Sequence, residues 1–188
     1  MRMSREAMDE HHRAIVAGGA RMLRERGIEG VSIAELMQSV GLTHGGFYRH
    51  FASKDAFVAE ASAHAFAEVA AMRSGAGNTS EPKDQLEAWI EYYLSDQHMT
   101  SPGIGCPIAA LAQDVHRSSD SVRAVFAEGI DHVLAWMSER LPGNTQARQA
   151  LAARLLAAMV GAVVTARTSS QPDLILGPAR EEARRLIA

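Results

Sequence analysis

The sequence predicts an all-α protein. Apolar residues recur at helical spacing through most of its 188 residues, and strand-like alternation of apolar and polar residues is absent. Glycine, proline and capping residues divide this pattern into about nine segments of helical length. Hydrophobic residues make up 47% of the chain, which is enough to bury a core, and the formal net charge is −3. A charge this small does not by itself indicate a nucleic-acid partner.

The first helix is expected from about Ser4 to Arg26, where apolar residues repeat every three or four positions. Basic residues at its end suit the negative end of the helix dipole, and Gly27 is a suitable C-terminal cap. Gly19 falls on the inner face, where a missing side chain would let a neighbouring helix come close. We therefore expect this helix to pack behind the two that follow it.

A short second helix is predicted after Ser32. Ser32 and Glu35 form the S-x-x-E capping box that satisfies free amides at a helix start. One buried face follows at i, i+3, i+4 and i+7, made by Ile33, Leu36, Met37 and Val40. Gly41 comes next, where a left-handed C-terminal cap is easiest for a residue without a side chain.

A third helix is predicted after only a few residues, with Thr43 as its N-cap. Phe47 and Phe51 share one face by their i, i+4 spacing. The opposite face then carries His44, Gly45, Tyr48 and Arg49. Two short helices joined by a tight turn, the second with a polar outer face, indicate a helix-turn-helix.

The outer face of this third helix has chemistry that suits DNA. Gly45 and Gly46 each cost about 1 kcal/mol relative to alanine in a helix, which is explained if a phosphate or base edge must approach the backbone. The Tyr48 hydroxyl and the Lys54 ammonium are suited to phosphate contacts. Ordinary solvated surface residues are the alternative reading of His44 and Arg49.

The rest of the chain continues as helices with clear breaks. Residues 74–82 form the clearest linker. Periodicity predicts a fourth helix from Ser53 to about Arg73 and a fifth with Pro82 in its first turn. It also predicts a sixth from about Pro107 to His116, a seventh from Asp120 to about Leu141, an eighth capped by Asn144 or Thr145, and a ninth from about Pro178, with room for a helical turn just before it.

Residues 27–33 and 41–57 together resemble the TetR/AcrR family of bacterial transcriptional regulators. The resemblance rests on Gly27 through Ile33, on the run Gly41-Leu42-Thr43-His44-Gly45-Gly46-Phe47-Tyr48-Arg49-His50-Phe51, and on Ser53-Lys54-Asp55-Ala56-Phe57. It covers about the first third of the chain. It implies a helix-turn-helix DNA-binding domain over residues 1–53 and a helical ligand-binding and dimerisation domain over residues 54–188.

The resemblance also implies roles for individual residues. Phosphate contacts fall to Ser32, Thr43, Tyr48, His50 and Lys54, and base contacts to His44 with its neighbours Gly45, Gly46 and Arg49. Met37 stands where the family more often has alanine, and His44 and Gly46 occupy variable positions. The operator sequence is therefore not predictable from this chain.

The family's effector pocket lies among helices that correspond to the fourth through eighth of this chain. The candidates for lining it are Phe66, Trp89, Tyr93, Cys106, Phe126 and Ile130, with His64, His116 and His132 as further polar members. A largely apolar pocket with few polar groups suits a small hydrophobic effector. Ordinary core packing remains the alternative for each of these side chains.

The eighth helix is small-sided and apolar almost all round, with Ala157, Ala158 and Gly161 beside valines. It is either a buried core helix or, as the resemblance implies, part of a homodimer interface made by the last two helices. A dimer would place two DNA-binding domains on the two half-sites of a near-palindromic operator.

Other functional classes find little support in the sequence. The single cysteine excludes an internal disulfide, and we expect no metal, no cofactor and a cytoplasmic, non-membrane protein. The best pair for an enzyme, Cys106 and His116, would lie about 15 Å apart along a helix, too far for direct proton transfer.

Cys106 at a helix N-terminus is either a reactive thiol or inert packing. We expect a ligand-responsive regulator, in preference a repressor, with an architectural DNA-binding protein as the other alternative.

Overall fold

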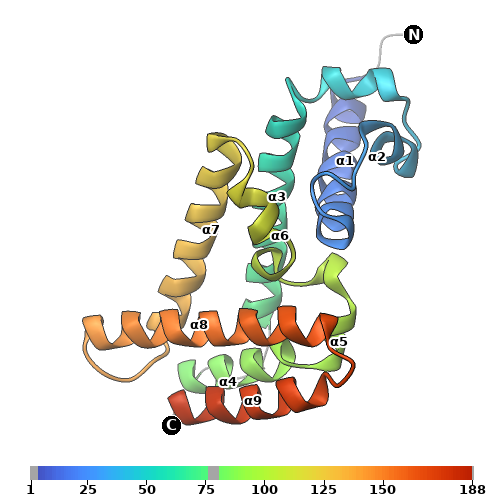
Figure 1. Cartoon of the computed structure of the whole chain (residues 1–188). Coiled ribbons are helices and arrows are strands. Elements are labelled where there is room, and N and C mark those ends of the chain that lie inside the picture. The colour runs from blue at the N-terminus through green and yellow to red at the C-terminus, as the bar shows by residue number, and fades with distance from the viewer. Residues whose placement is uncertain (1–3, 76–80, 188) are drawn as a thin grey trace.

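The computed structural model describes residues 4–75 and 81–187, and this part of the chain folds entirely into helices and connecting turns (Figure 1). The helices are α1 (Arg5–Arg26), α2 (Ile33–Ser39), the 3₁₀ helix η1 (His44–Arg49), α3 (Lys54–Gly75), α4 (Pro82–Tyr93), α5 (Asp96–Thr100), the 3₁₀ helix η2 (Pro102–Ile104), α6 (Pro107–His116), α7 (Asp120–Ser138), α8 (Thr145–Thr168) and α9 (Asp173–Ile187). The all-α prediction is confirmed.

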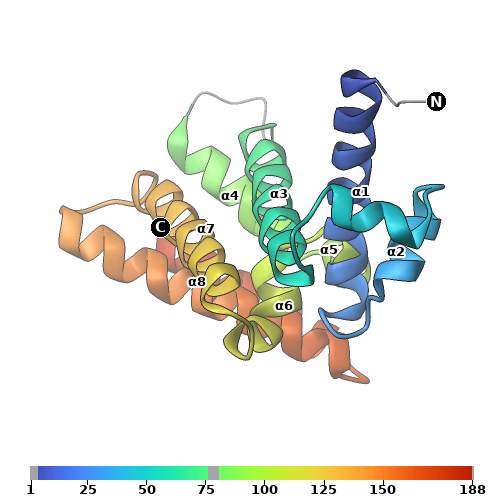
Figure 2. The same cartoon turned by 90° about the horizontal axis from the view of Figure 1, so that it is seen from above.

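The helices form two groups joined by the long helix α3. Helices α1 and α2 and the 3₁₀ helix η1 lie at one end, and α4, α8 and α9 lie at the other, with α8 and α9 side by side (Figure 1). The view from above shows α1 and α2 beside the start of α3, with α7 on the opposite side of α3 (Figure 2). Helix α3 thus belongs to both groups.

Local capping explains where the first helices begin and end. The Ser32 side chain accepts a hydrogen bond from the Glu35 amide, and the Glu35 carboxylate accepts one from the Ser32 amide, so the predicted capping box is present. Gly27 and Gly41 have φ of 77° and 73°, the left-handed region that a residue with a side chain rarely adopts. Both predicted stops are confirmed.

Gly19 determines how closely α1 and α3 pack. A Cβ atom added at Gly19 would lie 2.3 Å from the Phe57 ring, far inside van der Waals contact. The glycine therefore lets α3 approach α1 directly, as the sequence predicted for this position.

Two clusters of buried side chains make the core. The first, here called the N-terminal core, joins α1, α2, η1 and the start of α3 to side chains of α6 and α7, including Leu111 and Phe126. The second, the C-terminal core, joins α4, α8 and α9 to the end of α7. Phe66 of α3 packs against both clusters. Helices α3, α6 and α7 therefore connect the two ends of the molecule.

Two helix boundaries differ from the prediction. Helix α9 begins at Asp173 and contains Pro178 in its interior, so the predicted start near Pro178 is wrong. The proline is tolerated because the carbonyl that it leaves unbonded belongs to Leu174, a residue that is 69% exposed and can be hydrated. Helix α7 ends at Ser138, before the predicted Leu141.

The short helix α5 was not predicted. Ser95 caps it by accepting a hydrogen bond from the His98 amide, but five residues are too few to show apolar periodicity in the sequence. The predicted linker over residues 74–82 also begins late, since α3 continues to Gly75. Residues 76–80 of that linker lie outside the described part of the chain.

Helix α8 is apolar enough and long enough to cross a membrane by length and composition alone. An 18-residue window of it has a mean hydropathy of 1.6, and one third of that window is buried within the protein. Core helices of soluble proteins meet the same criterion, so this observation is weak evidence for a membrane. Most of α8 remains uncovered in the single chain.

Candidate DNA-binding surface and effector core

The helix-turn-helix is anchored by aromatic side chains. Phe47 of η1 is completely buried, and its ring centroid lies 5.2 Å from that of Phe51 and 5.8 Å from that of Phe57. Edge-to-face and tilted aromatic contacts of this kind stabilise a small core beyond the apolar area that they bury. The predicted inner face of the third helix is confirmed. The helix itself is a short 3₁₀ helix, His44–Arg49, and not an α-helix.

The opposite face of η1 is open to solvent. Tyr48 is 61% exposed, and His44, Gly45 and Arg49 are exposed beside it. The His44 and Tyr48 rings meet edge to face with centroids 6.4 Å apart. Nothing lies within 4 Å of a Cβ atom added at Gly45, so this glycine has no packing reason within the protein. A close approach by another molecule remains its best explanation.

Two details of this segment differ from the sequence interpretation. Thr43 occupies the N-cap position, but its side chain makes no capping hydrogen bond, because the first turn closes through the Gly46 amide and the Thr43 carbonyl. Gly46 has a partial packing reason, since an added Cβ would lie 3.3 Å from the methyl group of the buried Met37. The Thr43 hydroxyl therefore has no part in capping η1.

The remaining candidates for phosphate contacts have different surroundings. Ser32 is exposed, but its hydroxyl already donates to the Glu35 carboxylate at 2.6 Å. Lys54 begins α3 next to Ser53, whose hydroxyl caps the helix by accepting from the Ala56 amide. His50 is half-buried, and burial lowers its pKa, with nearby His12 acting in the same direction.

His12 helps to hold the helix-turn-helix against α1 and α3, a role that the sequence interpretation missed. Its ring stacks on Phe51 at 4.8 Å, and its Nε2 lies 2.5 Å from the Glu60 carboxylate. It thus ties α1 to the end of the helix-turn-helix and to α3. Phe51 and Glu60 lie far from His12 in the sequence, so helical spacing alone could not identify them as its partners.

A buried arginine connects the DNA-binding end to the rest of the molecule. The Arg24 guanidinium, on α1, donates to the Glu68 carboxylate at 2.6 Å and to the Gly105 carbonyl at 3.4 Å. Close by, the Ile28 amide donates to the Asp114 carboxylate at 2.9 Å. The position of α1 is therefore coupled to α3, to α6 and to the loop before α6.

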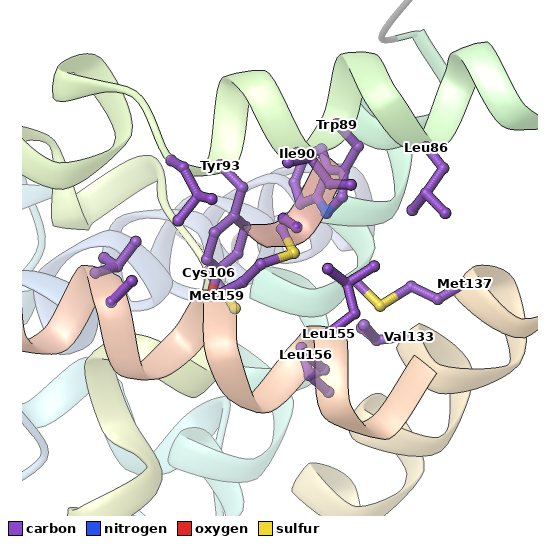
Figure 3. Packing of buried hydrophobic residues seen from close by; sticks show 14 of the residues in the cluster. Leu86, Trp89, Ile90, Tyr93, Cys106, Val133, Met137, Leu155, Leu156 and Met159 are labelled. Atoms are coloured by element: carbon purple, nitrogen blue, oxygen red, sulfur yellow. The ribbon is translucent and has the colours of Figure 1, made fainter. Parts of the chain in front are cut away.

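The structure divides the candidate effector residues into two sets. Trp89, Tyr93 and Cys106 are buried together in the C-terminal core, where Figure 3 shows Tyr93 and Cys106 beside one another. Phe66 and Phe126 pack edge to face at 5.2 Å between α3 and α7. The sixth candidate, Ile130, is half-buried and packs against the C-terminal core. A single pocket lined by all six is not present in the described part of the chain.

Polar groups of the C-terminal core are held by His98, which the sequence interpretation also missed. Its Nδ1–H donates to the Tyr93 carbonyl at 2.7 Å, and its Nε2 accepts from the Cys106 amide at 3.0 Å. Burial lowers the pKa of His98 to about 4, so the ring is neutral at neutral pH. The Tyr93 hydroxyl is buried, and burial raises its pKa.

The predicted polar pocket members lie elsewhere. His116 and His132 are exposed and His64 is half-exposed, so none of the three reaches the C-terminal core. His132 instead borders a hollow of about 260 Å³ between α3 and α7, here called the α3–α7 groove. The groove is lined by Ala63, Phe66, Ala67, Ala70, Arg73, Val125, Glu128, Gly129, His132 and Val133. Another hollow of about 500 Å³ lies between α7 and α8 and contains none of the six candidates.

Comparison with known proteins agrees with this geometry. Residues 15–61 match the family described as bacterial regulatory proteins, tetR family. The chain is 28% identical over 151 residues to the HTH-type transcriptional repressor NemR of Escherichia coli K12, covering 77% of this chain and 73% of that protein. It is 31% identical over 110 residues to an uncharacterised HTH-type transcriptional regulator of Mycobacterium tuberculosis, covering 58% of this chain and 55% of that protein.

Solved structures share the whole fold. The reduced form of E. coli NemR superposes with a TM-score of 0.79 at 21% identity, covering 95% of this chain and 97% of that one. A TetR-family regulator from Cytophaga hutchinsonii superposes with a TM-score of 0.84 at 19% identity, covering 100% and 96%. An exposed helix-turn-helix on this fold defines a DNA-binding transcriptional regulator. The chain is similar to the TetR family of these regulators, in sequence over residues 15–61 and in its overall fold.

Proposed function

We propose that the protein is a homodimeric, ligand-responsive repressor that a small, mostly apolar effector releases from a near-palindromic operator. The observation that carries the proposal is the presence in one chain of a free η1 face and of a distant apolar core, joined by the buried Arg24 contacts. The similarity to a protein named as a repressor supports the sign of regulation. The proposed binding to chromosomal DNA would require a cytoplasmic protein.

Regulation requires the effector to discriminate between two states. A ligand shifts the equilibrium only if it binds the DNA-incompetent state better than the DNA-competent state. The contacts of Arg24 with Gly105 and of Ile28 with Asp114 join the DNA-binding domain to α6 and to the loop that precedes α6. A displacement of α6 by an effector would therefore move α1. The movement of α1 would change the distance between the two DNA-binding domains of the dimer.

Lys54→Ala tests the phosphate contacts. The variant is expected to bind all DNA sequences more weakly and to reduce the magnitude of the slope of log K against log salt by about one per protomer, because one counterion fewer is released. Fluorescence anisotropy with an operator duplex at several salt concentrations measures this slope. Lys83→Ala removes the other lysine of the chain, an exposed residue of α4, and should leave the slope unchanged. A wild-type slope in Lys54→Ala would remove Lys54 from the interface.

The outer faces of α8 and α9 support the dimer. The exposed stripe of α8 is small and apolar and includes Ala157, Gly161 and Val164, the last of which is 44% exposed. Leu174 at the start of α9 is 69% exposed. A second copy of the same two helices would bury these side chains, and small residues would let the helices approach closely.

Gly161→Arg tests the dimer interface. Nothing lies within 4 Å of a Cβ atom at Gly161, so the protomer should accept the arginine while the partner helix cannot. We expect light scattering to show monomers at micromolar concentration. Operator affinity should be lost because the two DNA-binding domains are no longer linked. Gly75→Arg, at an equally open glycine at the end of α3, is the matched control and should stay dimeric. A dimeric Gly161→Arg protein would place the interface elsewhere.

The enzyme alternative and the reactive-thiol hypothesis find little support in the geometry. Cys106 and His116 lie at opposite ends of α6, the first buried and the second exposed. The Cys106 side chain is 5% exposed and makes no capping hydrogen bond with α6. Burial of this degree favours the packing role for the thiol.

A further inference from the structure

Arg73 is a buried cation with no counter-ion among the residues that the structure describes. It lies near the end of α3 and is only 5% exposed. Its guanidinium carbon lies 4.6 Å from the ring centroid of Trp136, on α7. Arg73 forms no ion pair with a carboxylate of residues 4–75 and 81–187, and its Nε has no hydrogen-bond partner there.

A second arginine on the same tryptophan shows the contrast. The Arg140 guanidinium lies 4.1 Å from the Trp136 ring centroid, and it donates to the Gln85 side-chain oxygen at 3.0 Å and to the Trp136 carbonyl at 2.9 Å. Arg140 is thus supplied with acceptors. Burial, together with repulsion from Arg140, lowers the pKa of Arg73 to about 10, so Arg73 is still charged at neutral pH.

A buried charge of this kind is costly unless it is paired. Stacking on Trp136 compensates the charge only in part, since an aromatic face attracts a cation but accepts none of the hydrogen bonds that the guanidinium can donate in its plane. A partner that the described residues do not supply would complete the site.

Arg73 lines the α3–α7 groove, which has the shape and composition to hold such a partner. Apart from Arg73, the α3 wall consists of small or apolar side chains, including Ala67 and Ala70. The α7 wall contributes Val125, Gly129 and Val133, and exposed Glu128 and His132 complete the lining. The groove therefore offers one buried cation beside an apolar channel of about 260 Å³.

We propose that the α3–α7 groove binds a small organic carboxylate with an apolar body, and that Arg73 is the anchor for its carboxylate. A planar guanidinium matches a carboxylate with two parallel hydrogen bonds, and such charge-assisted bonds are strong away from water. A neutral ligand would leave Arg73 unpaired, and a small anion would leave the groove unfilled. The inference deepens the proposed function by naming the chemical class of the effector.

Matched acid and amide probes test the anchor directly. Octanoate and 4-phenylbutyrate are titrated calorimetrically into the full-length protein without DNA, beside octanamide and 4-phenylbutanamide. The wild-type protein should bind each acid roughly tenfold or more tightly than its amide, as expected for a hydrogen bond to a charged group. Arg73→Met should lose this preference, because methionine fills the volume without the charge. Arg140→Met, which removes the other guanidinium from Trp136, should keep it.

Several outcomes would overturn the anchor role of Arg73. These are an equal acid-over-amide preference in wild-type and Arg73→Met protein, no saturable binding of either acid at millimolar concentration, or acetate binding as tightly as octanoate. Thermal melts provide a second measurement: octanoate should raise the Tm of the wild-type and Arg140→Met proteins only. If Arg73→Met does not fold, Arg73→Gln replaces it in both assays.

DNA binding is measured separately on the same proteins, without probes. A wild-type protein that binds acids through Arg73 but does not bind DNA would contradict the proposed function and leave the carboxylate site intact. A protein that binds DNA but shows no acid preference would contradict the carboxylate site alone.

Discussion

Replacement of Phe47 by alanine is expected to destabilise the helix-turn-helix and abolish operator binding. The Phe47 ring is completely buried and contacts the rings of Phe51 and Phe57, which come from the two following segments. Truncation of a buried phenylalanine to alanine removes apolar burial and leaves a cavity, at a cost of about 3 to 5 kcal/mol. That is a large fraction of the stability of a small domain. Chemical denaturation followed by circular dichroism measures the loss.

Tyr48→Ala, at the neighbouring position, is the matched control. Tyr48 is 61% exposed, so its removal should change the free energy of unfolding by no more than about 0.5 kcal/mol. It should nevertheless weaken binding to DNA, because the hydroxyl faces outward from η1. Equal stability of Phe47→Ala and Tyr48→Ala would contradict the assignment of these two residues to opposite faces.

The protein is expected to lose stability on mild acidification through His98. The folded-state pKa of His98 is about 4, below its ordinary value of 6.5, so the unfolded chain takes up the proton first as the pH falls. The stabilisation is fully present above pH 6.5 and is lost progressively as the pH falls from about 6.5 to about 4. A difference of this size corresponds to about 3 kcal/mol in the free energy of unfolding. Urea denaturation at a series of pH values measures it.

The variant His98→Asn separates this contribution from other titrations, including that of His50, whose lowered pKa acts in the same direction. We expect His98→Asn to be less stable at pH 7, because the Cys106 amide loses its acceptor, and to depend less on pH below neutrality. His116→Asn changes an exposed histidine of α6 and should reproduce the wild-type curve. An unchanged pH dependence in His98→Asn would show that another group is responsible.

The sequence by itself determined the local features of this protein. The start of α2 at Ser32, its stop at Gly41 and the start of α6 at Pro107 all depend on residues close together in the chain, whose capping and backbone preferences act within one helical turn. The buried faces of η1 and α4 follow from helical spacing for the same reason. The helix-turn-helix lies entirely within such a local stretch, which is why its outward residues could be predicted.

Only the tertiary structure decided which charged and polar side chains are buried. Arg24 and Arg73 lie on helices where an arginine is expected to be solvated, and their burial results from contacts with Glu68 and Trp136, residues far away in the sequence. The same holds for His98, whose two ring nitrogens bond to backbone groups on either side of a helix too short to show periodicity. Local spacing carries no information about which helix will cover a given face, because that depends on how all the helices pack together.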